Sequence, residues 1–193
     1  TPSVSRVFIT ENEVNYLAFP QVLDSLLIFG AGYGFEVLAQ AAWLTRCQVF
    51  YWGDIDTHGF AILDQLRTYL PHVRSLLMDR ATLLAFEAQW GVEDKQTLRN
   101  LPHLNVEECA LYDELRDNRL KPNLRLEQER IGFGWVESKY IRAFSRYRKV
   151  DEGRVPTKAE KSGEKTIYVG DVEATKVGAV SKSQLTAFID SNA

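Results

Sequence analysis

A short apolar run that leads straight into an acidic turn constrains this chain more than any other feature. Residues 48–52 (Gln-Val-Phe-Tyr-Trp) are typical of a buried strand, and apolar residues recur at helical spacing from Phe60 to Leu70. Asp54 and Asp56 lie between them, flanked by glycines. Such strand-to-helix turns lie at the carboxyl edge of open α/β sheets, where ligands bind. Carboxylates two residues apart in an extended chain point to the same side and can share a metal ion.

The same order of strand and helix recurs along the first half of the chain. Strands are predicted at residues 7–10, 25–29, 48–52 and 73–78, and helices at 14–18, 35–44, 60–70 and 80–90. Each connection is long enough for a crossover between parallel strands. We therefore expect an α/β fold with a mostly parallel sheet of about four strands, covered by helices on both faces.

The pattern changes after residue 91. Residues 106–120 have amphipathic helical spacing, whereas residues 124–131 suit either a strand or the start of a helix. Residues 137–193 carry 11 Lys and Arg against 8 Asp and Glu, and are rich in polar residues. We divide the chain into a domain of residues 1–136 and a basic linker and tail of residues 137–193, partly disordered or with a small hairpin near residues 166–169.

Composition limits the classes of protein to consider. With 193 residues, 45% of them hydrophobic, the chain can form one sizeable core, and we expect a soluble, cytoplasmic protein without a membrane span. Both cysteines are expected to be buried, since they share no metal-ligand spacing. The chain begins with Thr1 and strand-like residues follow at once, so we expect a natural amino-terminal part to precede it. Residues 1–136 carry 12 Lys and Arg against 18 Asp and Glu, so binding of nucleic acid there needs bound cations or a local arginine cluster.

Acidic residues follow three of the predicted strands. Glu11 follows the first, Asp54 and Asp56 the third, and Asp79 the fourth. If these strands are neighbours, the carboxylates gather along one edge, where their mutual repulsion is costly unless a cation is bound. Oxygen ligands suit Mg²⁺ or Mn²⁺. Asp79 has an equally good alternative role as the cap of the helix that follows it.

Two further features lie near this edge in the predicted fold. His58 could act as an acid or contact a phosphate, although capping of the following helix is the commoner role for such a residue. The turn at residues 30–34 (Gly-Ala-Gly-Tyr-Gly) lacks the third glycine of a dinucleotide-binding fingerprint, because Phe35 occupies that position. We expect it to form a tight turn, with Gly32 and Tyr33 beside DNA or phosphate.

Several segments together resemble a known family. Glu11 and the motif Gly-Asp-Ile-Asp-Thr-His-Gly at residues 53–59 look like the Toprim fold of topoisomerases and primases, in the form found in the A subunit of type IIB topoisomerases. More closely, residues 10–20, 51–59, 78–79 and 125–129 resemble the carboxy-terminal domain of JetD, the nuclease subunit of the Wadjet defence system. The likeness extends from about Val7 to Val136.

This resemblance implies metal-dependent cleavage of DNA. Glu11, Asp54 and Asp56 would be the metal ligands, supported by Glu129 and, less directly, by Glu127 or Asp79, while Arg125 would contact DNA. The implied partners are double-stranded plasmid DNA, an SMC-type motor complex and, as one option, a second copy of the chain. Hydrolysis by activated water is expected rather than attack by a tyrosine on another domain.

Two other classes of function stay open. A non-catalytic Toprim module would use the same metal-binding edge only to dock DNA or a partner. A phospho-acceptor regulatory domain would use an aspartate in a similar cluster, together with a lysine at that edge. We rank it last because no lysine precedes Lys95.

Overall fold

The fold is built around a parallel sheet. The computed structural model describes residues 4–20, 22, 24–30, 35, 38 and 40–139 in full, and the backbone of 140–141, 166–169 and 179–180. The strands are β1 (Arg6–Thr10), β2 (Ser25–Phe29), β3 (Gln48–Trp52), β4 (Arg74–Ser75), β7 (Thr166–Val169) and β8 (Ala179–Val180). They lie in the order β4-β3-β1-β2-β7-β8, and every neighbouring pair is parallel. The first four confirm the predicted parallel sheet.

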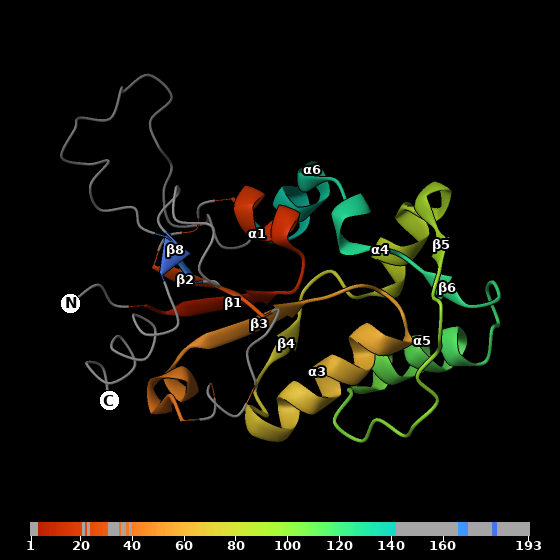
Figure 1. The fold of residues 1–193 in the computed structure, drawn as a ribbon, viewed down its shortest axis with the longest axis horizontal. Coiled ribbons are helices and arrows are strands. Elements are labelled where there is room, and N and C mark those ends of the chain that lie inside the picture. Colours follow the sequence, from red (N-terminus) through yellow and green to blue (C-terminus); the bar gives the residue numbers. More distant parts are fainter. Residues whose placement is uncertain are drawn as a thin grey trace.

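Helices cover both faces of this sheet. They are α1 (Glu13–Ala18), η1 (Ala42–Arg46), α3 (Thr57–Tyr69), α4 (Arg80–Ala85), η2 (Glu87–Gln89), α5 (Val106–Arg116), η3 (Gln128–Arg130), α6 (Phe133–Val136) and η4 (Glu137–Ile141). In Figure 1, α1 and α6 lie on one side of β1 and β3, and α3 and α5 lie on the other. A second, two-stranded antiparallel sheet pairs β5 (Gly91–Val92) with β6 (Leu124–Arg125).

Cover on both faces explains why the central strands are continuous apolar runs. Val7, Phe8 and Ile9 of β1 are each no more than 2% exposed, so side chains that point to opposite faces are equally buried. Aromatic rings fill one layer of this core, where Phe8 stacks on Phe50 with ring centroids 5.3 Å apart. The α/β class predicted from the strand and helix order is therefore confirmed.

Several elements differ in length from their predicted ranges. The strand expected at residues 73–78 is reduced to β4, because Leu77 adopts a positive φ of 58° and turns the chain away. The helix expected at residues 80–90 is interrupted at Phe86, and the Trp90 indole donates to the Leu83 carbonyl at 2.9 Å. Residues 124–131 contain both alternatives, since β6 is followed by η3.

Several other expectations are tested only in part. Residues 166–169 form β7, which pairs in parallel with β2 and β8, whereas the expected hairpin would have antiparallel strands. Residues 31–34 and 142–165 lie outside the described residues, and the division of the chain at residue 136 stays a prediction.

Cys47 is buried as expected, but Cys109 is exposed, because the buried face of α5 is formed by Glu108, Leu111 and Leu115. In the part of the chain that the structure describes, no helix is long and apolar enough to cross a bilayer.

A buried ion pair joins α3 to α5. The Arg67 guanidinium donates to both carboxylate oxygens of Glu108, at 2.5 and 3.0 Å, and to the Val73 carbonyl at 2.8 Å. The Ser75 hydroxyl donates to Glu108 at 2.6 Å. Although burial opposes it, hydrogen bonds from Arg67 and Ser75 hold the pKa of Glu108 below its usual value. This network fixes the helix α3, which directly follows the acidic motif.

Replacing Arg67 should therefore destabilise the fold. Arg67→Met leaves the buried Glu108 carboxylate without its countercharge, and we expect the free energy of unfolding to fall by about 3–5 kcal/mol. Urea denaturation would measure this change. Arg80→Met is the matched control, because Arg80 pairs with Glu114 at 2.9 Å while 53% of its side chain is exposed. The control should lose less than about 1 kcal/mol; equal losses would contradict the assigned role of the buried pair.

Candidate active site

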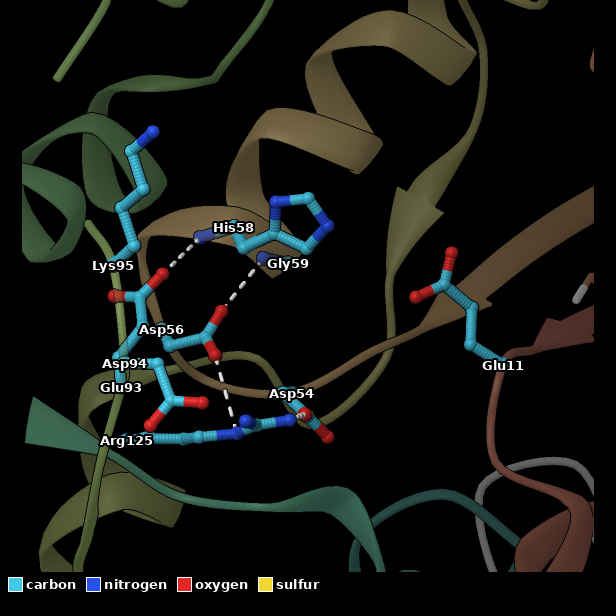
Figure 2. A pocket seen from close by; sticks show the side chains of 9 residues that line it. All are labelled: Glu11, Asp54, Asp56, His58, Gly59, Glu93, Asp94, Lys95 and Arg125. Atoms are coloured by element: carbon cyan, nitrogen blue, oxygen red, sulfur yellow. Dashed lines mark hydrogen bonds and ion pairs between the residues drawn. The ribbon is translucent and has the colours of Figure 1, made fainter. Parts of the chain in front are cut away.

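The acidic residues meet because β1 and β3 are neighbours in register. Thr10, the last residue of β1, pairs with Trp52, the last residue of β3. Glu11 and Gly53 therefore leave the sheet side by side at its carboxyl edge. Glu11, Asp54 and Asp56 line one cavity of about 310 Å³ at this position. The remaining residues that line it are His58, Gly59, Glu93, Asp94, Lys95 and Arg125, as Figure 2 shows.

Asp54 is held from two sides. One carboxylate oxygen, Oδ1, accepts from the Gln128 backbone N–H at 2.9 Å. The other, Oδ2, accepts from Nη2 and Nε of Arg125 at 2.5 and 3.1 Å. These partners are in place because Ile55 and Leu126 form an antiparallel bridge with backbone N–H···O distances of 2.9 and 3.1 Å. The chain that follows β6 thus fixes the orientation of the first aspartate.

Asp56 caps helix α3. Its Oδ1 accepts from the Gly59 backbone N–H at 2.7 Å, which starts the helix at Thr57, one turn earlier than the apolar spacing predicts. Its Oδ2 lies 3.3 Å from Nε of Arg125. Burial raises the pKa of Asp56 to about 6, helped by the charges of Glu93 and Asp54 and opposed by the Gly59 hydrogen bond and Arg125. The second aspartate is therefore both a structural cap and a group at the cavity wall.

Glu11 faces the aspartates from the end of β1. Burial, together with the negative charge of Asp54 and to a smaller extent that of Asp56, raises its pKa to about 7, while the nearby Tyr51 hydroxyl opposes the shift. In Figure 2 the Glu11 carboxylate lies across the cavity from Asp56, on the opposite side of Asp54. A cation among the three carboxylates would offset their repulsion.

Glu93 is a cavity residue that the sequence analysis missed. It is 4% exposed, and its carboxylate accepts from the Thr57 hydroxyl at 2.8 and 2.9 Å and from the His58 backbone N–H at 3.1 Å. An acid at the amino end of a helix is favoured by the helix dipole. The strand that precedes it, β5, has two residues and no apolar periodicity, so no sequence signal points to Glu93. Its place follows from the pairing of β5 with β6.

Lys95 also lines the cavity. A phospho-acceptor domain needs a lysine at the acidic edge, and we expected none there because no lysine precedes Lys95. Lys95 itself lies at this edge, so that reason against a phospho-acceptor function does not hold. Both oxygens of Asp54 are nevertheless engaged by Arg125 and Gln128. This arrangement does not favour Asp54 as a free acceptor of a phosphoryl group.

The other predicted site residues have different surroundings. Asp79 caps α4 by accepting from the Thr82 N–H at 2.7 Å, and it does not line the cavity. Glu127 pairs with Arg130 at 2.6 Å, and Glu129 accepts from the Asn12 amide; neither residue lines the cavity. The side chain of His58 is exposed at the cavity, and the helix cap is Asp56 instead. Gly32 and Tyr33 lie outside the described residues.

The donor set suits a hard divalent cation, but it is not arranged as a finished coordination site. Glu11, Asp54 and Asp56 supply carboxylate oxygens to one cavity, as Mg²⁺ and Mn²⁺ prefer. Among the residues that the structure describes, however, no three of His, Cys, Asp and Glu are grouped closely enough to hold an ion. Arg125 occupies the space between the two aspartates. Binding of an ion would therefore require Arg125 to move.

Gly59 should tolerate no side chain. A Cβ atom there would overlap the carbonyl oxygen of Asp54, because the first turn of α3 packs directly on the Asp54 backbone. We expect Gly59→Ala to lower the melting temperature and to cost about 1–3 kcal/mol in the free energy of unfolding. Gly134→Ala is the control, since nothing lies within 4 Å of the Cβ position at Gly134. Equal melting temperatures for the two variants would contradict the close packing.

The stability of the metal-free chain should fall as the pH rises. A carboxyl group with a raised pKa favours the folded state only while it is protonated. The contribution of Glu11 is therefore complete below its ordinary pKa of 4.5 and is lost as the pH rises through about 7. The free energy of unfolding should fall from pH 5 to pH 8, and in Glu11→Gln we expect this fall to be smaller by about 1–3 kcal/mol than in the wild type. Urea denaturation with a chelator present would measure it. An unchanged pH dependence would contradict the burial of this carboxyl.

Comparison with known proteins agrees with this geometry. The family model of the Wadjet protein JetD, C-terminal, matches residues 1–140, which include every residue that lines the cavity. A short stretch of 23 residues is 91% identical to a thioredoxin of Allochromatium vinosum, and covers 12% of this chain and 22% of that protein. The chain thus spans about a fifth of that thioredoxin, too little to indicate a thioredoxin fold or activity. The chain belongs to the family of the C-terminal region of the Wadjet protein JetD, which implies a role in defence.

Proposed function

We propose that the chain is a Toprim-type nuclease domain that cleaves DNA in a Wadjet defence system with the help of Mg²⁺ or Mn²⁺. The observation that carries this proposal is the single cavity at the carboxyl ends of β1 and β3, into which Glu11, Asp54 and Asp56 project. Membership of the JetD family supports the choice of DNA as substrate. An SMC-type motor complex as partner, and a homodimer as one arrangement, belong to the same proposal.

The residues of the chain would divide the work of phosphodiester cleavage. Glu11, Asp54 and Asp56 would hold the cation, which when bound would supply positive charge to the transition state and align the attacking water. Arg125 and Lys95 are the cationic side chains at the cavity that can bind phosphate oxygens. His58, exposed at the same cavity, is placed to exchange a proton with the reacting group or the solvent.

Hydrolysis by activated water, without a tyrosine of this chain as nucleophile, is the route that we propose. The two tyrosines nearest the motif in sequence are Tyr51, which is fully buried, and Tyr69, whose helix α3 ends at the opposite side of the domain from the Asp56 cap. Tyr51 is packed among acidic groups, and burial together with the charge of Glu11 raises its pKa well above the usual value. It is thus unsuited to act as a nucleophile on DNA.

A plasmid-nicking assay on the full-length protein with its partner complex tests the proposal. Glu11→Gln and Asp56→Asn should each reduce the cleavage rate at least about 100-fold in Mg²⁺ or Mn²⁺, because each removes a charge from the cation site. Glu107→Gln, on the exposed side of α5, is the control and should cut at the wild-type rate. Wild-type activity in both site variants would exclude this cavity as the catalytic centre.

The competing function is a non-catalytic module that docks DNA or a partner through the same edge. A titration with Mn²⁺ in the complete assembly separates the two. Binding of the ion without any cleavage of DNA by the complete assembly would favour docking.

A further inference from the structure

Arg125 takes the position between the two aspartates that a cation would need. Its Nε lies 3.1 Å from Oδ2 of Asp54 and 3.3 Å from Oδ2 of Asp56, and its Nη2 lies 2.5 Å from the former. Figure 2 shows the guanidinium between the two carboxylates at the floor of the cavity. One positive side chain therefore bridges both members of the acidic pair.

The remaining oxygens of the aspartates are already committed to the backbone. Oδ1 of Asp54 accepts from the Gln128 N–H at 2.9 Å, and Oδ1 of Asp56 accepts from the Gly59 N–H at 2.7 Å. Each carboxylate oxygen keeps a second lone pair, but a cation shared through the two Oδ2 atoms would compete with Arg125, which contacts both of them. Arg125 and the cation exclude each other at this position.

The structure allows the side chain to leave while the backbone stays. Arg125 pairs with Gly91 in the small sheet, and its neighbour Leu126 is bridged to Ile55. One third of the Arg125 side chain is exposed, whereas only 3% of the Asp56 side chain is. Because the Asp56 carboxylate is buried, leaving it without a countercharge would be costly, so Arg125 can leave only when the divalent cation takes over its charge.

We propose that Arg125 is a built-in counter-cation of Asp54 and Asp56 that a divalent cation displaces, and that the released guanidinium then binds a phosphate of the nucleic acid at the cavity. This inference rests on the proposed function and adds an order of events to it. The planar guanidinium suits both tasks, because it binds carboxylates and phosphates through the same pair of parallel hydrogen bonds. Cation binding would thereby expose a phosphate-binding group.

Measuring Mn²⁺ affinity by calorimetry tests the exchange without any need for cleavage. Arg125→Gln removes the competing charge, so it should bind Mn²⁺ about 3–10-fold more tightly than the wild type. Arg130→Gln is the matched control, because Arg130 lies in the same segment and pairs with Glu127 outside the cavity. It should bind Mn²⁺ like the wild type. Weaker or unchanged Mn²⁺ binding by Arg125→Gln would overturn the proposal and make Arg125 a positioning residue for Asp54.

Binding of a short DNA duplex with a cleavage-resistant phosphorothioate backbone tests the second half. Arg125→Gln should weaken binding by about 10-fold when Mn²⁺ is present, and by less than about 2-fold in a chelator, where the wild-type arginine is still held by the aspartates. An equal loss under both conditions would contradict the release of Arg125 by the cation.

A second variant guards against misfolding. Arg125→Lys keeps one charge but cannot bridge two carboxylates, so its Mn²⁺ affinity should lie between those of the wild type and Arg125→Gln. An affinity outside that interval would contradict the exchange. Metal-dependent nicking with no effect of Arg125 on Mn²⁺ affinity would leave the proposed function in place and remove this inference. If Arg125 affects Mn²⁺ affinity as proposed but the complete assembly does not nick DNA, this inference would stand and the proposed function would be wrong.

Discussion

The parallel pairing of β1 with β3 is the constraint on which the site depends. The pairing Thr10 with Trp52 brings Glu11 beside the turn that carries Asp54 and Asp56, although more than forty residues separate them in the chain. Both faces of these strands are buried, so a slip of one residue would exchange side chains of different size between the two packed faces and disrupt the close packing of the core. The hydrophobic core therefore sets the position of the acids, and no interaction among the acids themselves is needed to bring them together.

Much of this arrangement could be predicted from the sequence. The bounds of β2 and β3 are the predicted ones, because each is a short apolar run with a sharp polar or glycine boundary. Parallel strands share one carboxyl edge, so Glu11 and the two aspartates could be assigned to the same place before their neighbours were known. Local signals of this kind are strong when a buried strand ends directly at the functional residue.

The partners of these acids could not be predicted, because they come from contacts between distant segments. Glu93 reaches the first turn of α3 from 36 residues along the chain, and Arg125 reaches Asp54 from 71 residues away. Glu93 directly follows β5 and Arg125 lies in β6, and these two strands have two residues each and carry no periodic pattern. The role of Asp79 could not be predicted for a different reason. A helix cap and a metal ligand both call for an acidic residue after a strand, so the sequence allowed either role, and the structure shows the cap.

The bridge between Ile55 and Leu126 has a consequence for how the domain is made. Asp54 and Asp56 leave the ribosome about seventy residues before the segment that neutralises them, so the nascent chain carries a bare acidic turn for several seconds at ordinary synthesis rates. Closing so long a loop is also entropically slow compared with forming α3. The site is thus expected to be among the last parts of the domain to become ordered, when Arg125 reaches the two aspartates.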